Sequence, residues 1–290
     1  MPGEADLRAR FVSLLKKSLL NDLHVENDAV LLAMLEASVT GAPIDLNRLV
    51  KLRRSGSFET IERAKAEGDV IVFSRPQADR TWQPVDLREL NHLWHVMMGR
   101  KRLDNLERCI ESVLADGIPG DLIETGVWRG GGTIFMRGML AAHGVTDRAV
   151  WVADSFAGFP PPSLPEDAGT DFSVARRDEA VSLDEVQALF ERYGLLDAQV
   201  HFLKGWFRDT LPSAPIERLA VLRLDGDLYE STMDALNPLY DKISPGGYVI
   251  VDDYFSCPPC AHAVRDFRRQ RGVTDEMLVI DGHSLYWRKS

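Results

Sequence analysis

Cysteine is scarce in this sequence of 290 residues, which has only Cys109, Cys257 and Cys260. Three cysteines in a chain of this length do not form the disulfide framework of a small secreted domain, and an odd number leaves at least one thiol unpaired. Cys109 falls within a helical pattern and is expected to be buried. The segment Cys257-Pro-Pro-Cys260 resembles half of a zinc or redox motif, but no second pair of cysteines or histidines stands at zinc spacing. The sequence therefore favours a proline-rich loop before a helix, without thiol chemistry.

Long apolar runs and a surplus of basic residues are also missing. No window approaches the roughly 18 apolar residues of a membrane span, and the first residues lack the basic, apolar and small-residue order of a signal peptide. Acidic residues outnumber basic ones by 44 to 34, for a net charge of −10. This balance argues against a surface that binds phosphate backbones. We therefore expect a cytoplasmic protein that binds neither membranes nor nucleic acid.

What the sequence does have, from about residue 120 onward, is an alternation of short apolar runs with amphipathic helical patterns. The runs expected to be strands are 120–125, 148–156, 199–205, 219–227, 246–253, 276–282 and 283–289, and the expected helices are 131–144, 182–195, 231–244 and 260–273. Such alternation predicts an α/β fold with a mostly parallel sheet and crossover helices. The last two strands follow each other so closely that they should form an antiparallel hairpin.

The first 120 residues have a different pattern. Residues 6–38 and 86–116 are predicted to be helical, the second stretch with an interruption near Gly99, and the charges in "GRKRLDNLERC" favour a solvated helix face. A loop-rich insert is expected over about 40–85. The sequence thus predicts an N-terminal helical cap with an insert over 1–96 and a sheet domain over 97–290.

The first strand of the sheet domain ends in a glycine-rich turn, "LIETGVWRGGGT", with Glu124, Gly126 and Gly130. Ligands of open α/β sheets bind at the carboxyl ends of the strands. A dinucleotide fingerprint would need a glycine where Trp128 stands, which disfavours pyrophosphate binding. A carboxylate at this point suits a ligand with a cationic group, such as the amino group of S-adenosylmethionine. The alternative is a glycine-rich turn that binds nothing.

The second and third strands end in further candidates for a nucleoside site. Asp154 can bind both hydroxyls of a ribose, or it can simply cap a turn. Gly205 and Trp206 follow the third strand, where an aromatic ring can pack on an adenine, although a tryptophan in the core is an equally good interpretation. Acids at two successive strand ends favour the nucleoside interpretation.

Four carboxylates follow the fourth and fifth strands: Asp225, Asp227, Asp252 and Asp253. Like charges that lie close together raise each other's pKa, so such a cluster usually has a compensating cation. Carboxylate oxygens suit a hard divalent ion, and Mg²⁺ is the expected one. One of the four can instead be a cap or a turn residue. Asp227, two residues beyond a candidate ligand, can reach a substrate hydroxyl as a general base.

Six motifs, in this order, resemble the macrocin O-methyltransferase family of sugar O-methyltransferases in macrolide and aminocoumarin biosynthesis. They are "MMGRKRLDNLERC", "GDLIETGVWRGG", "VWVADSFAGFP", "RYGLLDAQVHFLKGWFRDTLP", "LAVLRLDGDLYESTMDAL" and "GGYVIVDDY". The resemblance covers about 97–290, with "LLKKSLLN" near the start. Two segments depart from the family pattern, between Asn27 and Met97 and from Pro160 to Ser182, and relatives use such segments to hold the acceptor.

The resemblance implies a class I methyltransferase fold, Rossmann-like, with a seven-stranded sheet. It implies an enzyme that uses S-adenosylmethionine and Mg²⁺ to methylate a deoxysugar hydroxyl of a glycosylated natural product, and a homo-oligomer, dimer or higher. It places the metal ligands on Asp225, Asp252 and Asp253 and the base on Asp227. The cofactor site of the family falls on Glu124, Gly126 and Gly130, on Asp154 with Ser155, and on Gly205 with Trp206.

Two other functions stay open from the residues alone. The first is a nucleotide-dependent dehydrogenase, which Trp128 disfavours. The second is a non-catalytic protein that binds the cofactor and docks a partner through its helical cap. The two differ from a methyltransferase in their ligands, because the first requires a dinucleotide and the second requires no metal.

Overall fold

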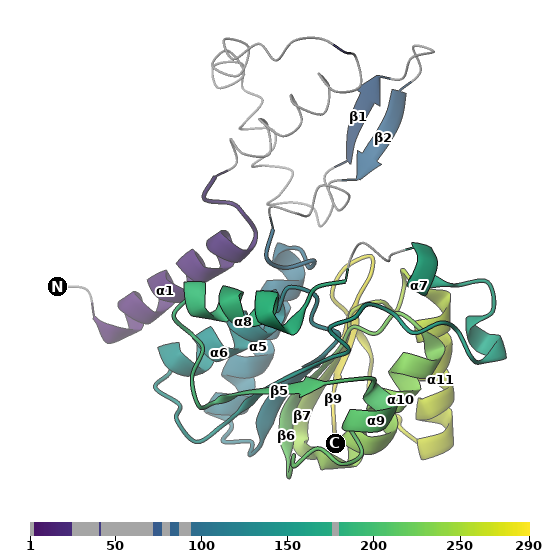
Figure 1. Cartoon of the computed structure of the whole chain (residues 1–290). Coiled ribbons are helices and arrows are strands. Elements are labelled where there is room, and N and C mark those ends of the chain that lie inside the picture. Colours follow the sequence, from purple (N-terminus) through teal and green to yellow (C-terminus); the bar gives the residue numbers. More distant parts are fainter. Residues whose placement is uncertain (1–2, 25–40, 42–71, 77–81, 87–93, 176–179) are drawn as a thin grey trace. The chain divides into compact units, whose positions relative to one another are not determined.

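The computed structural model describes residues 3–24, 41, 72–76, 82–86, 94–175 and 180–290, with the backbone alone for 72–76 and 82–86. The chain forms two compact units, one of residues 1–12 and 101–290 and one of residues 13–100. Most of the predicted insert lies outside the described residues (Figure 1). None of the helices in the described part of the chain has the length and apolarity that a membrane crossing requires.

The larger unit is built on a seven-stranded sheet with the strand order β5-β4-β3-β6-β7-β9-β8. Its strands are β3 (Asp121–Thr125), β4 (Val150–Asp154), β5 (Val200–Lys204), β6 (Leu219–Leu224), β7 (Ile243–Val251), β8 (Leu278–Val279) and β9 (Leu285–Arg288). The first five pair in parallel, whereas β9 is antiparallel to β7 and to β8. The predicted mostly parallel sheet with a C-terminal antiparallel hairpin is therefore confirmed.

The strand order reverses at β3, which has β4 on one side and β6 on the other. The chain runs from β3 toward one edge of the sheet and then returns to continue from β6 toward the opposite edge. In open α/β sheets the crevice at such a reversal is where ligands bind, outside the carboxyl ends of the strands. The residues that follow β3 and β6 are therefore in the position where a site is expected.

Helices cover both faces of the sheet (Figure 1). They are α5 (Arg100–Ala115), α6 (Gly131–Ala142), α8 (Leu183–Arg192), α10 (Tyr229–Leu239) and α11 (Pro258–Arg271), with the short helices α7 (Phe172–Ala175), α9 (Phe207–Thr210), η2 (Pro165–Asp167) and η4 (Tyr240–Lys242). At the start of α8, Ser182 and Glu185 form a capping box, in which each side chain accepts from the other residue's backbone N–H.

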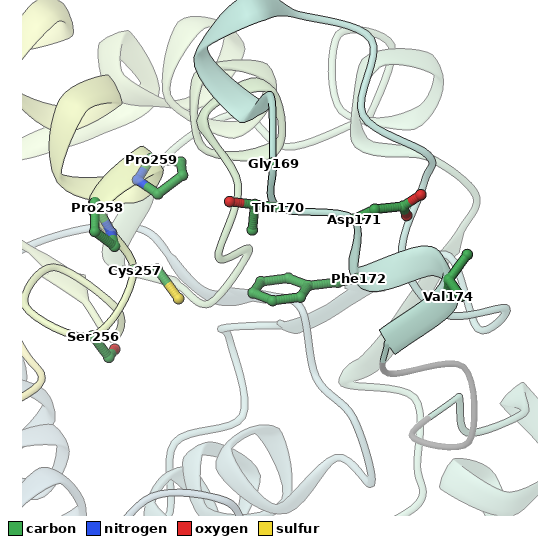
Figure 2. A pocket seen from close by; sticks show the side chains of 9 residues that line it. All are labelled: Gly169, Thr170, Asp171, Phe172, Val174, Ser256, Cys257, Pro258 and Pro259. Carbon is green, nitrogen blue, oxygen red and sulfur yellow. The ribbon is translucent and has the colours of Figure 1, made fainter.

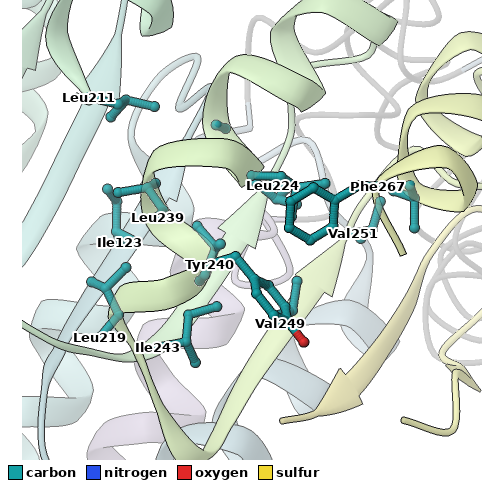
Figure 3. Close-up of a cluster of buried hydrophobic side chains, with 14 of the residues drawn as sticks. Ile123, Leu211, Leu219, Leu224, Leu239, Tyr240, Ile243, Val249, Val251 and Phe267 are labelled. Carbon is teal, nitrogen blue, oxygen red and sulfur yellow. The ribbon is translucent and has the colours of Figure 1, made fainter. Parts of the chain in front are cut away.

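A cluster of buried apolar side chains lies between the sheet and the helices α10 and α11 (Figure 3). Leu222 and Leu224 of β6 pack there with Val249 and Val251 of β7, and Phe267 comes from α11. Every residue of β6 is buried, as expected for a central strand with helices on both faces. This core fixes the carboxyl ends of β6 and β7, where the acids of the candidate site follow.

The N-terminal part differs from the prediction in three places. Helix α1 (Glu4–Leu19) ends within the predicted helix, and residues 25–38 of that prediction lie outside the described residues. Asn21 just after the helix has a left-handed φ of 56°, a conformation typical of a helix C-terminus. The helix predicted over 86–116 is interrupted at Gly99 as expected, but residues 94–98 are not helical either, so α5 begins at Arg100. Residues 87–93 of that prediction lie outside the described residues. Within the predicted loop-rich insert, β1 (Val72–Pro76) and β2 (Trp82–Asp86) form an antiparallel pair.

Candidate active site

A buried arginine, Arg223 near the end of β6, binds three carboxylates at the carboxyl edge of the sheet. Its Nη1 donates to Glu124 Oε1 at 2.5 Å and to Asp225 Oδ2 at 2.7 Å, and its Nη2 lies 2.5 Å from Asp252 Oδ1. The side chains of Arg223 and Glu124 are both 2% exposed. Because strands β3, β6 and β7 are neighbours, acids 128 residues apart in the sequence, Glu124 and Asp252, meet around one guanidinium.

A second guanidinium, that of Arg102 in α5, holds the other side of Asp252. Arg102 Nη1 donates to Asp252 Oδ2 at 2.7 Å, and its Nε lies 2.9 Å from Asp281 Oδ2. Ser284 donates to the backbone oxygen of Asp252 at 2.6 Å. Burial alone would raise the pKa of Asp252, but Arg102 and Arg223 outweigh burial and hold this pKa below its usual range. Asp252 is therefore an ionised carboxylate with a fixed orientation.

Asp253, the next residue, lies in the opposite electrostatic situation. Burial and the neighbouring Asp227, Asp225 and Asp252 hold its pKa well above the usual range. Its Oδ2 is buried and finds no hydrogen-bond partner among the described residues. Asp253 is thus the member of the cluster that is most in need of a cation or a proton.

The acids fit a divalent cation. Asp225, Asp252 and Asp253 each offer an oxygen atom, and these atoms lie within 4.8 Å of one another. A carboxylate-only donor set suits Mg²⁺ better than a soft metal. A second group, Asp227, Asp253 and Cys257, is equally close but includes a thiol, which a hard ion does not prefer. The first group is the one on which the family resemblance places the metal ligands, and it comes together as a cluster.

The glycine-rich turn between β3 and α6 is shaped by close approaches of its backbone. A Cβ on Gly126 would lie 1.7 Å from the carbonyl oxygen of Asp225, and Gly126 has a φ of 85°, so only glycine fits there. A Cβ on Gly132 would lie 2.3 Å from Glu124 Oε1. Gly130 precedes α6 with a φ of 81°. The turn therefore brings the ends of β3 and β6 together and seats Glu124 at the start of α6.

Glu124 has the properties of a ligand-binding carboxylate. Burial raises its pKa to about 8, although Arg223 opposes this shift. Its Oε2 is buried and, within the described part of the chain, has no hydrogen-bond partner. Natural proteins rarely leave a buried carboxylate oxygen unsatisfied without a functional reason. A ligand that brings a hydrogen-bond donor or a positive charge would satisfy it.

Asp154 ends β4 and holds the turn that follows β3. Its Oδ2 accepts from the backbone N–H of Val127 at 2.8 Å, and its Oδ1 accepts from the backbone N–H of Phe156 at 2.7 Å. Ser155 donates to Asp154 Oδ1 at 3.4 Å and to the Gly158 carbonyl at 2.6 Å. Asp154 thus makes the turn contacts of the alternative interpretation, and ribose binding by it stays a prediction.

Gly205 and Trp206, at the end of β5, lie next to this turn. The backbone N–H of Gly205 donates to the Asp154 carbonyl at 2.9 Å, and Trp206 precedes α9. Trp206 is only partly buried, so it does not belong to the core. A partly buried indole at this strand end is compatible with stacking on a base, which stays a prediction.

Asp227 follows β6 and contacts the residue that directly precedes α11. It is 6% exposed and has a left-handed φ of 56°, which aspartate tolerates better than most residues. The thiol of Cys257 donates to Asp227 Oδ1 with an Sγ–Oδ1 distance of 3.1 Å. The helix predicted from residue 260 begins at Pro258, and the hydrogen bond gives Cys257 a structural contact that the sequence did not predict. Cys257 directly precedes α11, and its thiol bonds Asp227 beyond the end of β6 instead of capping the helix.

An open pocket with a volume of about 680 Å³ borders this end of the site. Residues 169–172 and Val174 line one side and residues 256–259 the other, and Figure 2 shows Phe172 and Cys257 facing each other across it. Asp167 anchors the first side, since its carboxylate accepts from the backbone N–H groups of Tyr229 at 2.7 Å and Glu230 at 3.0 Å at the start of α10. The pocket is large enough for a drug-sized ligand.

Sequence reasoning missed the two arginines of the site. Arg102 was expected on a solvated helix face, but it is 7% exposed. It is buried because it forms ion pairs with Asp252 and Asp281. Arg223 stands in an otherwise apolar run, "LAVLRL". A charged residue inside a strand that is buried on both faces is a signal that could have identified it, because such a charge needs a buried partner.

Comparison with known proteins identifies relatives of this chain. The family model described as macrocin-O-methyltransferase (TylF) matches residues 8–289. An 8-demethyl-8-(2,3-dimethoxy-alpha-L-rhamnosyl)-tetracenomycin-C 4'-O-methyltransferase of Streptomyces olivaceus is 55% identical over 216 residues, 70% of this chain and 80% of the relative. A mycinamicin III 3''-O-methyltransferase of Micromonospora griseorubida is 55% identical over 203 residues, 68% of this chain and 79% of the relative.

A solved structure is similar as well. The O-methyltransferase NovP is 54% identical, with a TM-score of 0.67 over 68% of this chain and 83% of NovP. The sheet described above is therefore a methyltransferase fold, in agreement with the class I architecture that the motifs imply.

Proposed function

We propose that this chain, which belongs to the macrocin-O-methyltransferase family and is an O-methyltransferase, transfers a methyl group from S-adenosylmethionine to a sugar hydroxyl of a glycosylated natural product. The observation that carries the proposal is the cluster of Asp225, Asp252 and Asp253 beside Glu124 at the point where the strand order reverses. The names of two relatives give the 4' and 3'' oxygens as their methylation sites, which supports a sugar acceptor.

Glu124 and Asp154 are the proposed ligands of the methyl donor. Glu124 Oε2 is the buried oxygen in need of a donor, and the cationic amino group of S-adenosylmethionine fits it. Asp154 and Ser155 would face the ribose, and Trp206 the adenine. S-adenosylmethionine supplies a methyl group on a positively charged sulfur, which makes that carbon electrophilic.

Asp225, Asp252 and Asp253 are the proposed ligands of Mg²⁺. When bound, the ion would polarise an acceptor hydroxyl and lower its pKa. The two guanidiniums keep Asp252 ionised and in place before any ligand arrives. Electrostatic preorganisation of this kind is the largest single contribution in many enzymes.

Asp227 is the proposed general base. Its carboxylate lies beyond the end of β6, two residues after Asp225, and Cys257 orients it by donating to Oδ1. In the proposed step Asp227 takes the proton of the acceptor hydroxyl, the oxygen forms a bond to the methyl carbon, and the bond from that carbon to sulfur breaks. The proton thus leaves the acceptor as its oxygen acquires the methyl group.

The pocket beside Cys257 gives the acceptor a route to Asp227. Its walls come from residues 169–172 with Val174 and from residues 256–259, and the first wall lies in the segment that departs from the family pattern. We infer that this pocket takes the part of the glycoside next to the methylated sugar. The homo-oligomer, dimer or higher, also stays a prediction.

A methylation screen tests the proposed function. The purified chain would be incubated with Mg²⁺, S-adenosylmethionine labelled in its methyl group, and deoxysugar glycosides of aromatic and macrolide polyketides, each paired with its sugar-free aglycone. We expect label on the sugar of at least one glycoside and none on the matched aglycone. Label on the aglycones alone would contradict the sugar assignment, and binding of NAD in place of S-adenosylhomocysteine would contradict the methyl donor.

A further inference from the structure

The guanidinium of Arg223 connects residues that the proposed function assigns to two different ligands. Nη1 bonds both Glu124, a proposed ligand of the methyl donor, and Asp225, a proposed ligand of the metal ion. Nη2 lies 2.5 Å from Asp252, a second proposed ligand of the ion. One side chain therefore contacts residues of both the proposed donor site and the proposed metal site.

Arg223 has a single positive charge, which it shares among three carboxylates. Arg223 is 2% exposed, so water hardly screens its interactions and each of the three ion pairs is stronger than a surface pair. The same Nη1 donates to Glu124 and Asp225, so a shift of the group toward one carboxylate weakens its bond with the other. Glu124 and Asp225 thus compete for one nitrogen of Arg223, whereas Asp252 has Arg102 as a second cation.

The proposed donor site and the proposed metal site each have a buried carboxylate oxygen that a ligand could bind. Glu124 Oε2 and Asp253 Oδ2 are buried and have no hydrogen-bond partner among the described residues. The proposed ligands, an ammonium group and a divalent ion, are both positive. Any extra neutralisation of one acid by Arg223 therefore reduces the attraction of that acid for its own ligand.

We propose that Arg223 is a positioning residue that couples the donor site to the metal site by distributing one buried charge between Glu124 and the pair Asp225 and Asp252. The proposal rests on the proposed function for the assignment of the two ligands. A change in one acid that Arg223 binds alters the affinity at the other site, although the ligand there does not touch the changed residue. Such a cross effect is a coupling free energy in the ordinary sense.

The experiment measures the two ligands separately. Mn²⁺, which prefers the same oxygen donors as Mg²⁺, is titrated without methyl donor and followed by the paramagnetic resonance of the free ion. S-adenosylhomocysteine is titrated by calorimetry without metal. We expect Glu124→Gln to weaken Mn²⁺ binding at least threefold, because Arg223 then binds Asp225 and Asp252 more strongly. We expect Asp225→Asn to weaken S-adenosylhomocysteine binding at least threefold, because Arg223 then binds Glu124 more strongly.

Two matched variants serve as controls. Asp154→Asn changes a proposed donor ligand whose oxygens bond backbone N–H groups, and it should leave Mn²⁺ affinity within twofold of the wild type. Asp253→Asn changes a proposed metal ligand outside the three ion pairs of Arg223, and it should leave S-adenosylhomocysteine affinity within twofold. The two cross effects are independent, so a variant that fails to fold leaves the other as the test.

Cross effects no larger than those of the controls, in a wild-type chain that binds both ligands, would contradict the coupling alone. A wild-type chain that binds neither ligand would contradict the proposed function and the coupling with it.

Discussion

The two halves of the carboxyl edge of the sheet satisfy their charges in different ways. Around Arg223 and Arg102, buried acids bond guanidiniums at 2.5–2.9 Å, so this half is held together by the chain itself. Around Asp227 and Asp253, the donors are the thiol of Cys257 and the hydroxyl of Ser256, and an open pocket begins. The difference indicates that the first half is assembled before ligands bind, whereas the second half is completed by the metal ion and the acceptor.

The largest expected effect comes from Asp227 in the open half. Asp227→Asn keeps the size of the side chain but removes the proposed base, and general base catalysis contributes about 10²–10⁴-fold to a rate. We expect kcat to fall by about this factor while the affinity for S-adenosylhomocysteine stays unchanged. Steady-state kinetics and calorimetry measure the two quantities.

The exposed Asp241, whose side chain is 69% accessible, provides a matched control for that substitution. Asp241→Asn should leave kcat unchanged. A turnover in Asp227→Asn equal to that of the control would remove Asp227 from the chemistry.

The closed half should dominate stability. Arg223→Met leaves Glu124, Asp225 and Asp252 without a shared cation, and loss of one partner of a buried ion pair costs about 3–5 kcal/mol. We expect a drop of this size in the free energy of unfolding, measured with urea. Arg208→Met, which removes an exposed pair with Glu230, should cost less than about 1 kcal/mol. Equal costs for the two variants would contradict a closed, buried network.

Cys257 tests whether the thiol orients the base. Cys257→Ala removes the donor to Asp227 Oδ1, and loss of one neutral hydrogen bond, about 0.5–1.5 kcal/mol, predicts a decrease in kcat of about two- to tenfold. Cys257→Ser keeps a donor and should retain activity. Cys260→Ser, at the other cysteine of the motif, should also retain it. If alanine and serine at position 257 give the same turnover, the hydrogen bond has no role in orienting the base.

The smallest effect concerns protons released when the methyl donor binds. The pKa of Glu124 is raised to about 8 by burial, so near pH 7.5 the free protein holds a fraction of a proton there. A cationic ammonium beside the carboxylate lowers this pKa, and binding then releases that fraction. Calorimetry of S-adenosylhomocysteine binding in buffers of different ionisation enthalpy measures it.

Glu124→Gln should abolish the proton release. The release should also decrease well above pH 8, where Glu124 is already ionised in the free protein. Uptake of protons on binding, or a release that persists in Glu124→Gln, would show that another group titrates.

The sequence predicted the acids of the site because the carboxyl ends of parallel strands meet at one edge. Glu124, Asp225 and Asp252 each follow or end an apolar run, so their proximity required only the strand assignment. Arg102 could not be placed in this way, since its contact with Asp252 depends on which face α5 turns toward the sheet. The bond from Cys257 to Asp227 depends likewise on where α11 begins.

The N-terminal part was less predictable for a related reason. The helical pattern of residues 6–38 continues past Leu19, but Asn21 in a left-handed conformation ends α1, and a periodic pattern alone does not locate such an end. The pairing of β1 with β2 was also missed, because the Pro and Gly residues around them favour loops. Local propensity is a weak guide where the pairing of two segments decides the structure.

The account depends most on methyl transfer that requires a divalent ion at the acid cluster. The direct measurement is the initial rate of label transfer from S-adenosylmethionine to the best glycoside of the screen, in protein treated with EDTA and then supplied with Mg²⁺. We predict that the rate falls to background with EDTA and returns with Mg²⁺ in the wild type, but does not return in Asp253→Asn. A rate that EDTA leaves unchanged would contradict the metal site. It would also contradict the contrast between the half of the carboxyl edge held by arginines and the half completed by ligands.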